Sequence, residues 1–349
     1  MFDSQLQVPV TEYNLGAFDG EVSLTADVLE RQELTGMHRF LCIAVHFIDE
    51  SWILRKWAIK CCSIDDVFGV EPLDAIIKSL DEWEIRDKTS SLTLDFEYEA
   101  EEFDNIKRHV QEKKKLSLNG QLFRVNCYAE CVSLVVRTAF NEIRETIFKI
   151  NRLCSHKKPP LLWYVQNSNL KQALKMRYEG KFSSKAVKKR FAVPSVEEWK
   201  KVEAVCKIVD SIYNVAKGLF HKENVTANLY LYHLDEIREI LTKISNESPE
   251  SFAGAVARGR MLKYLDDYWK DTFLVLAIAV VLNPRFKMKY IEFTCSKYWG
   301  SGEASSSHVK MVSDAIHELY DDYCTRFRGK AMSSSSTLGN SEEGSLMVR

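Results

Sequence analysis

The chain of 349 residues has no excess of charge of either sign, because 48 Lys and Arg residues face 49 Asp and Glu residues. A net charge of −1 gives no global attraction to DNA or to an anionic membrane, so nucleic-acid binding would require a local basic patch. The chain also lacks a long apolar run, and its longest, Phe273 to Leu282, is too short to span a bilayer. The N-terminal residues are neither basic nor followed by an apolar stretch, so no secretory signal is expected.

Zinc-finger spacing is missing among the nine cysteines. Only Cys127 with Cys131 and Cys61 with Cys62 are clustered, and no pair of histidines follows at a spacing suited to zinc. An odd number of scattered cysteines cannot all pair, which indicates reduced intracellular thiols. We therefore expect them to be small hydrophobic side chains rather than metal ligands.

The first part of the chain shows the period of β-strands. Apolar residues alternate with polar ones in EVSLTADVL, HRFLCIAVHFI is apolar on both faces, and WILRKWAIKCC alternates as an edge strand does. A helix over Leu73–Leu80, a strand SLTLDF and a polar helix EEFDNIKRHVQEKKK follow. A turn, the short strand QLFRVNC and one long helix from Val132 to Ile150 complete the pattern.

This order is three antiparallel strands, then a helix, a strand, a helix, a strand and a helix. A crossover helix makes the fourth strand parallel to a strand of the first group. That is the strand order of the ribonuclease H-like fold, so we expect a mixed sheet core over residues 21–155. Residues 1–20 are expected to be irregular.

Strand patterns disappear after about residue 160. Two helical stripes follow, one from Trp199 to Phe220 and one from Met261 to Trp269, and they predict an all-helical domain over residues 160–328. The prolines of HKKPPLL, in residues 155–165, favour a break between the two domains. The Ser/Gly/Glu-rich residues 329–349 are expected to be disordered. The aromatic residues of the stripes are expected in the core rather than on a base-stacking surface: Trp199, Tyr213, Tyr268 and Trp269.

Two strands of the form Ser-Leu-Thr-x-Asp carry the most specific chemistry. Asp27 and Asp95 each follow a threonine by two residues, so aspartate and threonine share one face of the strand. If the two strands are neighbours, the carboxylates are oxygen ligands suited to Mg²⁺, and a third carboxylate would complete a two-metal clamp. The alternative is that both aspartates simply cap the turns that follow.

Several segments together resemble the plant hAT transposases, including domesticated proteins of the zinc finger BED, RICESLEEPER and DAYSLEEPER type. They include SLTADVLE, HRFLCIAVHFIDESWILRKWAI, SSLTLDFEYEAEEFDNIKRHV and MLKYLDDYWKDTFLVLAIAVVLNPRFKMKYIEF. The last segment resembles the family's Lys-Tyr-x-x-Tyr-Trp and Ala-x-Val-Leu-Asp-Pro-Arg-x-Lys stretch and is the most specific match. The resemblance runs from about residue 21 to residue 323. It implies a ribonuclease H-like core, an inserted helical domain and catalytic roles for Asp27 and Asp95.

The chain departs from the family pattern at several positions. Phe96 replaces the Asn that follows the second Asp, and Glu130 replaces the His of the Cys-x-x-His motif. The BED finger, the region of the third catalytic carboxylate and the dimerisation segment are not expected in this chain, and Glu318 lies in the wrong place to supply that carboxylate. Because the ligands of such a site act as a unit, the resemblance implies that Asp27 and Asp95 are vestigial.

Two basic stretches, KRHVQEKKK and KFSSKAVKKR, could contact DNA phosphates. The alternative is a solvated helix face or loop, and the second stretch also fits a weak nuclear-localisation patch. The candidate contacts are Lys107, Arg108, Lys113, Lys114, Lys115, Lys188, Lys189 and Arg190.

The interpretation is a transposase-derived, non-catalytic, nuclear protein that keeps some nucleic-acid or protein binding. Its expected partners are DNA or other hAT-derived chains, with no membrane and no small-molecule substrate. No cofactor is expected beyond weakly bound Mg²⁺. The alternatives are a metal-dependent transposase or nuclease, a scaffold that binds no DNA, and a cytoplasmic location.

Overall fold

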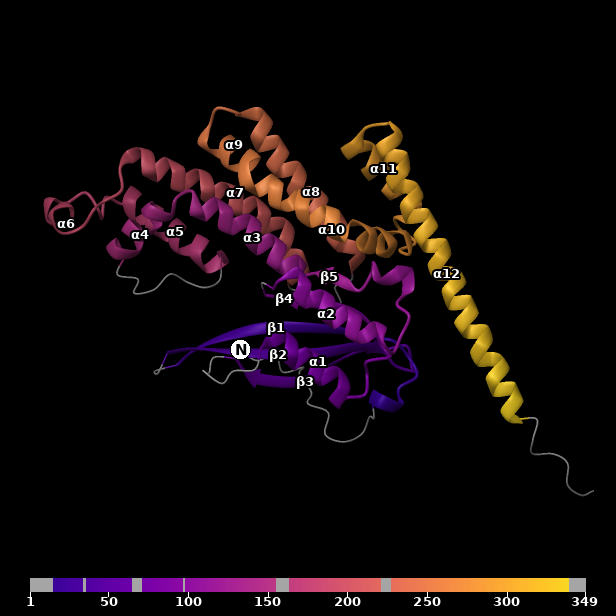
Figure 1. The fold of residues 1–349 in the computed structure, drawn as a ribbon. Helices are drawn as coiled ribbons and strands as arrows, with labels where there is room; N and C mark the ends of the chain where they lie inside the picture. The colour runs from indigo at the N-terminus through magenta and orange to yellow at the C-terminus, as the bar shows by residue number, and fades with distance from the viewer. Residues whose placement is uncertain are drawn as a thin grey trace, which may run out of the picture. The chain divides into compact units, whose positions relative to one another are not determined.

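A computed structural model describes residues 15–33, 36–64, 71–96, 98–154, 163–220 and 227–338 (Figure 1). The chain divides into two compact units. The sheet unit comprises residues 1–93, 97–125 and 281–349, and the helical unit comprises residues 94–96 and 126–280. Within the described residues, no helix is long and apolar enough to cross a membrane.

Five strands form one sheet in the order β3-β2-β1-β4-β5. The pairs β1–β2 and β2–β3 are antiparallel, which confirms the predicted three-stranded start of the chain. The Asp49 carboxylate fixes the turn between β2 and β3, because its Oδ1 accepts hydrogen bonds from the backbone N–H groups of Ser51 and Ile53, both at 2.9 Å. The strands are β1 (Val22–Glu33), β2 (Gly36–Ile48), β3 (Leu54–Ser63), β4 (Thr89–Asp95) and β5 (Arg124–Asn126).

The neighbours β1 and β4 run parallel. The backbone N–H of Val22, the first residue of β1, donates to the carbonyl of Lys88, which directly precedes β4, at 3.0 Å. The starts of both strands therefore lie side by side, as the crossover through α1 (Pro72–Glu82) requires. This confirms the predicted mixed sheet and the ribonuclease H-like order of its elements.

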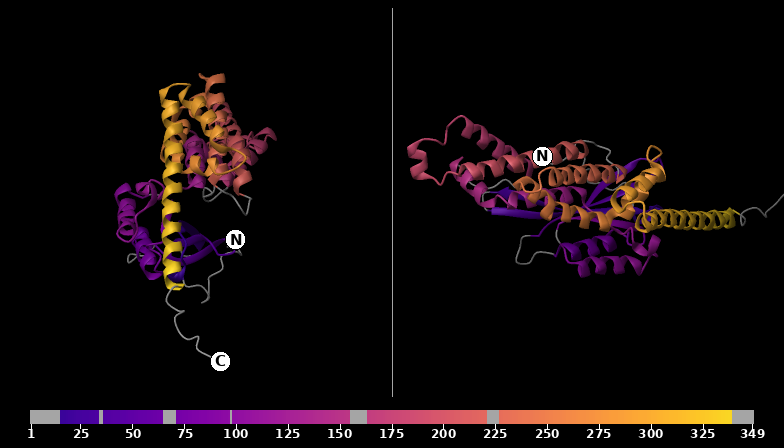
Figure 2. Two further views of the ribbon diagram at one scale, coloured as in Figure 1. Left: turned by 90° about the vertical axis from the view of Figure 1, so that its right-hand side faces the viewer. Right: turned by 90° about the horizontal axis from the view of Figure 1, so that it is seen from above.

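Helices α1 and α2 (Ala100–Gln111) cover one face of the sheet (Figures 1 and 2). Pro72 opens α1, and Glu99 and Glu102 form a capping box at the start of α2. Each fully buried aliphatic or aromatic side chain contributes roughly 1.5–3 kcal/mol to stability. The core of this layer consists of Leu24, Ile43, Ile76, Leu80, Leu92, Phe103, Ile106 and Phe123, all almost inaccessible to solvent.

The helical unit contains no strand from residue 127 to 280, as far as its residues are described. Trp199, Val202 and Val209 on the predicted stripe are buried, and Trp269 is only 3% exposed, which confirms a core role for them. The elements are α3 (Tyr128–Asn141), α4 (Arg144–Leu153), α5 (Trp163–Tyr178), α6 (Lys185–Arg190), α7 (Val196–Phe220), α8 (Ala227–Glu247), α9 (Phe252–Val256), η3 (Ala257–Met261) and α10 (Leu262–Val281).

The single helix predicted from Val132 to Ile150 is wrong. It breaks between α3 and α4, where Ile143 has φ −120° and ψ 19°. The N–H of Ile143 bonds to the carbonyl of Phe140, three residues back, so the helical ladder tightens and stops there. Ile143 is nevertheless only 2% exposed, because the break leaves its side chain in the core. The stripe of apolar residues therefore continues across the break, and its period cannot distinguish two helices from one.

The compact units also divide the chain differently from the expected ranges 21–155 and 160–328. Helices α3 and α4 belong to the helical unit, whereas α11 (Lys287–Trp299) and α12 (Glu303–Leu338) return to the sheet unit. Helix α12 forms one long rod in both views of Figure 2 and continues into the segment 329–349 that was expected to be disordered. The proline segment at 155–162 and residues 1–14 and 339–349 lie outside the described residues.

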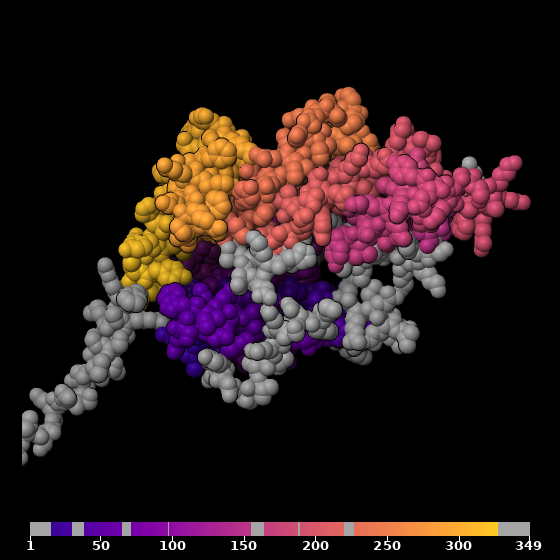
Figure 3. Space-filling view, turned by 180° about the vertical axis from the view of Figure 1, so that it is seen from behind, coloured from indigo at the N-terminus to yellow at the C-terminus, as the bar shows by residue number. Residues whose placement is uncertain are grey.

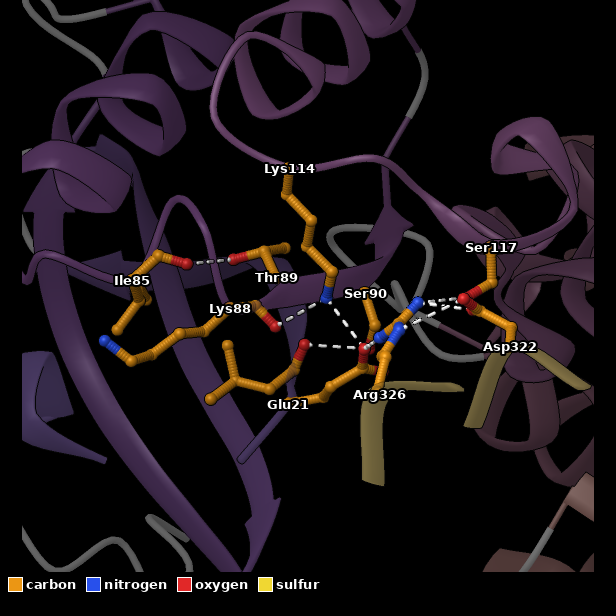
Figure 4. Close-up of polar contacts among 10 residues, drawn as sticks. Glu21, Ile85, Lys88, Thr89, Ser90, Lys114, Ser117, Asp322 and Arg326 are labelled. Carbon is orange, nitrogen blue, oxygen red and sulfur yellow. Dashed lines mark hydrogen bonds and ion pairs between the residues drawn. The ribbon is translucent and has the colours of Figure 1, made fainter. Parts of the chain in front are cut away.

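A cluster of ion pairs explains why α12 returns to the sheet unit (Figure 4). Arg326 bonds to Glu21 beside the start of β1, and also donates to Ser117 Oγ at 2.8 Å. Ser117 in turn donates to Asp322 at 2.7 Å. These contacts join residues about 200 to 300 positions apart in the sequence, so local patterns could not reveal them.

Candidate functional site

Asp27 lies on β1 with its side chain on the face opposite the apolar core. Residues Val22, Leu24 and Ala26 are buried on the core face, whereas Thr25 and Asp27 are half-buried on the other. In the antiparallel register, Asp27 stands directly opposite Cys42 of β2. The position of Asp27 therefore follows from the two-residue period of the strand.

His46 shares this face and forms a polar contact with β1. Its Nε2 lies 3.0 Å from Thr25 Oγ1. Burial, and then the charge of Lys56, lowers the pKa of His46 from 6.5 to about 4. Its imidazole is therefore neutral at pH 7.

Asp95 ends β4 and is also half-buried. Burial raises the pKa of its carboxyl, while a hydrogen bond from the Cys127 thiol and the charge of Arg137 oppose that rise. Burial, followed by the charge of Asp95, raises the pKa of Cys127 to about 12, so the thiol keeps its proton and donates a hydrogen bond to the carboxylate. No sequence pattern predicts this side-chain contact, because it depends on how the end of β4 packs against the start of α3.

The sheet order confirms that the strands of the two aspartates are neighbours. In both strands the buried leucines hold even-numbered positions, whereas Asp27 and Asp95 hold odd-numbered ones on the opposite side. Binding of one ion by both carboxylates stays a prediction. Among the residues that the structure describes, no group of three His, Cys, Asp or Glu side chains is placed to hold a metal ion. Glu318 is exposed on α12 and lines a groove with Leu118.

One of the predicted DNA contacts is used inside the protein. The Lys114 ammonium donates to Glu21 Oε1 at 2.9 Å and to the carbonyl of Lys88 at 3.4 Å, with a side chain only 10% exposed. Glu21 is the same carboxylate that Arg326 binds (Figure 4). Lys114 is therefore a structural cation, and it is dropped as a phosphate contact.

The other candidates of the first basic stretch lie at the end of α2 and just after it. Lys107 is half-buried and packs so closely on Gly120 that a Cβ there would lie 2.5 Å from Lys107 Cε. Arg108 donates to Asn105 on its own helix, whereas Lys113 and Lys115 are exposed. The sequence alone could not sort these lysines by exposure.

The last six residues of the second basic stretch form α6, which lies at one extremity of the helical unit in Figures 1 and 3. Ser184 caps this helix by accepting a hydrogen bond from Val187 N at 3.2 Å. Lys189 and Arg190 are exposed, and the Arg190 guanidinium lies 5.5 Å from the Phe191 ring centroid. The side chain of Lys188 lies outside the described part of the structure.

A third basic surface was not recognised from the sequence. Arg285, Lys287 and Lys289 are all exposed where the chain turns into α11. Asn283 forms this turn by accepting a hydrogen bond from the Arg285 N–H at 3.0 Å. The alternating basic residues of NPRFKMK were the available signal, but they were interpreted only as part of a family motif.

Two family models match the chain. A model described as the ZBED1 RNase-like domain matches residues 35–122, and one described as a hAT-like transposase with RNase-H fold matches residues 228–323. Each match covers less than half of the chain. The second match runs from α8 into α12.

Curated relatives point to the same family. Zinc finger BED domain-containing protein RICESLEEPER 1 of Oryza sativa subsp. japonica is 29% identical over 87% of this chain and 45% of its own length. DAYSLEEPER of Arabidopsis thaliana is 26% identical over 89% of this chain and 48% of its own length. A putative AC transposase of Zea mays is 24% identical over 88% of this chain and 42% of its own length. The chain thus spans less than half the length of these relatives. The chain is therefore similar to hAT transposase-derived proteins, and its mixed sheet has the strand order of the ribonuclease H-like fold.

Proposed function

We propose that this chain is a transposase-derived protein that binds nucleic acid through local basic surfaces and does not by itself cut or join DNA strands. The observation that carries the proposal is the incomplete ligand set. Asp27 and Asp95 lie on neighbouring strands, but no group of three His, Cys, Asp or Glu side chains among the described residues is placed to hold a metal ion. A two-metal clamp needs more carboxylate ligands than this pair provides.

The electrostatics of Asp95 also support weak metal binding. A metal ligand must be deprotonated, and burial raises the pKa of this carboxyl. The Cys127 thiol already occupies part of its hydrogen-bonding capacity. Mg²⁺ would be held by Asp27 and Asp95 with its remaining ligands supplied by water, and such a site binds weakly.

We expect the purified chain to leave supercoiled plasmid intact in Mg²⁺ or Mn²⁺. The assay compares the wild type with Asp27→Asn and Asp95→Asn, and a commercial nicking enzyme shows that the conditions permit cleavage. All three proteins should give the same background, because none completes a metal clamp. Metal-dependent nicking by the wild type that both substitutions abolish would overturn the proposal.

The exposed cations of α6 are the strongest candidates for binding DNA. Lys185, Lys189 and Arg190 are exposed on a helix of only six residues at the end of the helical unit. Neighbouring cations are already paired, since Lys181 lies 2.9 Å from Glu179 and Arg177 lies 3.3 Å from Glu203. The basic stretch that contains α6 also fits a nuclear-localisation patch, which supports our proposal of a nuclear location. Duplex DNA is the partner that we propose there.

Reversing the charge at Lys189 and Arg190 should weaken binding to a fluorescent DNA duplex. The plot of log affinity against log salt should also become shallower, by about 0.9 for each phosphate contact that is lost. The matched control reverses Lys243 and Lys270, which have side chains 72% and 73% exposed on other helices. Both double variants change the net charge equally. Equal losses of affinity in the two would show that α6 is not the contact surface.

A further inference from the structure

Two cysteines stand directly opposite each other on neighbouring strands. Cys42 of β2 is in register with Cys61 of β3, and a hydrogen bond joins their thiols. Arg39 and Ile64 form a hydrogen-bonded pair, with Ile64 N donating to Arg39 O at 3.0 Å. Because such pairs alternate in an antiparallel ladder, the Cys42–Cys61 pair is a non-hydrogen-bonded one, with Cα atoms about 4.5 Å apart.

This geometry is suited to a covalent bond between the two sulfurs. Disulfides join residues with Cα atoms about 4.4–6.8 Å apart, and the strand pair falls within that range. Cys61 is exposed on the edge strand, whereas Cys42 is half-buried between Cys61 and Asp27, its register partner on β1. Cys62 is also half-buried, but it is in register with Leu41 rather than with a cysteine.

We propose that Cys42 and Cys61 form a reversible cross-strand disulfide that locks the edge strand β3 to β2 beside Asp27. With glutathione disulfide as oxidant, the Cys61 thiolate attacks one glutathione sulfur and displaces the other glutathione as a thiolate. Cys42 then loses its proton to solvent and attacks Cys61 Sγ, which releases the second glutathione. Two protein thiols are oxidised and one glutathione disulfide is reduced to two glutathione thiols.

The order of attack follows from exposure. Cys61 meets the oxidant first because it lies on the surface, whereas Cys42 is half-buried directly opposite Cys61 and is therefore placed for the second, intramolecular step. Exposed disulfides have more oxidising potentials than buried structural ones, so this bond should open again in a reducing compartment. The pair would therefore report oxidation at the sheet face that carries Asp27.

The test is peptide mapping of the full chain after exposure to glutathione disulfide. Free thiols are alkylated, and the protein is digested with trypsin without reductant. Cleavage after Arg39, Arg55 and Lys60 places Cys42 on a different peptide from Cys61 and Cys62. We expect a linked Cys42–Cys61 peptide that disappears after dithiothreitol, together with a rise in Tm on oxidation.

Cys62→Ser is the matched control, since it removes the adjacent thiol and should keep both the linked peptide and the Tm shift. Cys61→Ser should lose both. A lasting glutathione adduct on Cys61 with Cys42 still alkylated, or loss of the link in Cys62→Ser, would overturn the proposal. Because the wild type alone gives the linked peptide, a variant that fails to fold does not block the test. DNA binding and nicking do not enter the result.

Discussion

Gly254→Ala should lower the free energy of unfolding by about 1–3 kcal/mol, the cost of overpacking a filled site. A Cβ at this position would lie 2.1 Å from the Ser248 carbonyl oxygen and 2.9 Å from its carbon. These are backbone atoms, which cannot move aside as a flexible side chain can. A hydrogen bond also holds the Gly254 backbone in place, because its N–H donates to Ser251 Oγ at 3.0 Å where Ser251 caps α9. Urea denaturation followed by circular dichroism measures the change.

Gly218→Ala is the matched control for this substitution. Gly218 lies within α7, and a Cβ there would meet nothing within 4 Å. Alanine has the higher helix propensity, so this variant should be more stable by roughly 0.5–1 kcal/mol. Opposite signs for the two glycines would show that close approach to the Ser248 carbonyl, rather than the loss of a glycine, sets the cost. Two neutral variants would contradict the close approach of the Ser248 backbone to α9.

The sheet could be predicted from the sequence because each strand is specified by residues that are close together in the chain. The alternation of Leu24 and Ala26 with Thr25 and Asp27 specifies both a strand and the face on which the carboxylate lies. On β4, Leu94 and Asp95 alternate in the same way, with the leucine buried and the aspartate on the opposite face. The family resemblance then placed these strands in one fold, and the sheet order confirms that they are neighbours.

The return of α11 and α12 could not be predicted in the same way. Arg326 and Glu21 are 305 residues apart, and neither has a neighbour in the sequence that indicates the pairing. The Glu21 carboxylate also binds Lys114, so this lysine is not available to contact phosphate. A run of lysines predicts charge, but only tertiary contacts decide which of its members face solvent.

Desolvation at the candidate site is likewise a tertiary effect. The pKa of Asp95 rises because the packed chain removes water from it, and the Cys127 thiol that opposes the rise comes from the segment between β5 and α3. The sequence shows which residues can ionise. The extent of burial depends on contacts that no two-residue or 3.6-residue period encodes.

The buried imidazole of His46 should make the protein less stable as the pH falls from 7 to 5. Its pKa is lowered from 6.5 to about 4 in the folded protein, by burial first and by Lys56 second. The unfolded chain therefore binds the proton more tightly than the folded chain does, and acid favours unfolding. The stability contributed by the neutral form is present above pH 6.5 and is lost as the pH falls towards 4. Linkage puts the loss between pH 7 and pH 5 at about 2 kcal/mol.

His46→Gln should remove this part of the pH dependence, since glutamine does not titrate and can still hydrogen-bond to Thr25 Oγ1, which lies 3.0 Å from His46 Nε2. Urea unfolding of both proteins at pH 7 and pH 5 gives the difference, and contributions from all other titrating groups cancel in it. His317→Gln, at an exposed position on α12, is the control that changes the histidine count equally. A wild-type acid loss that persists in His46→Gln, or that His317→Gln removes instead, would show that the proton responsible binds elsewhere.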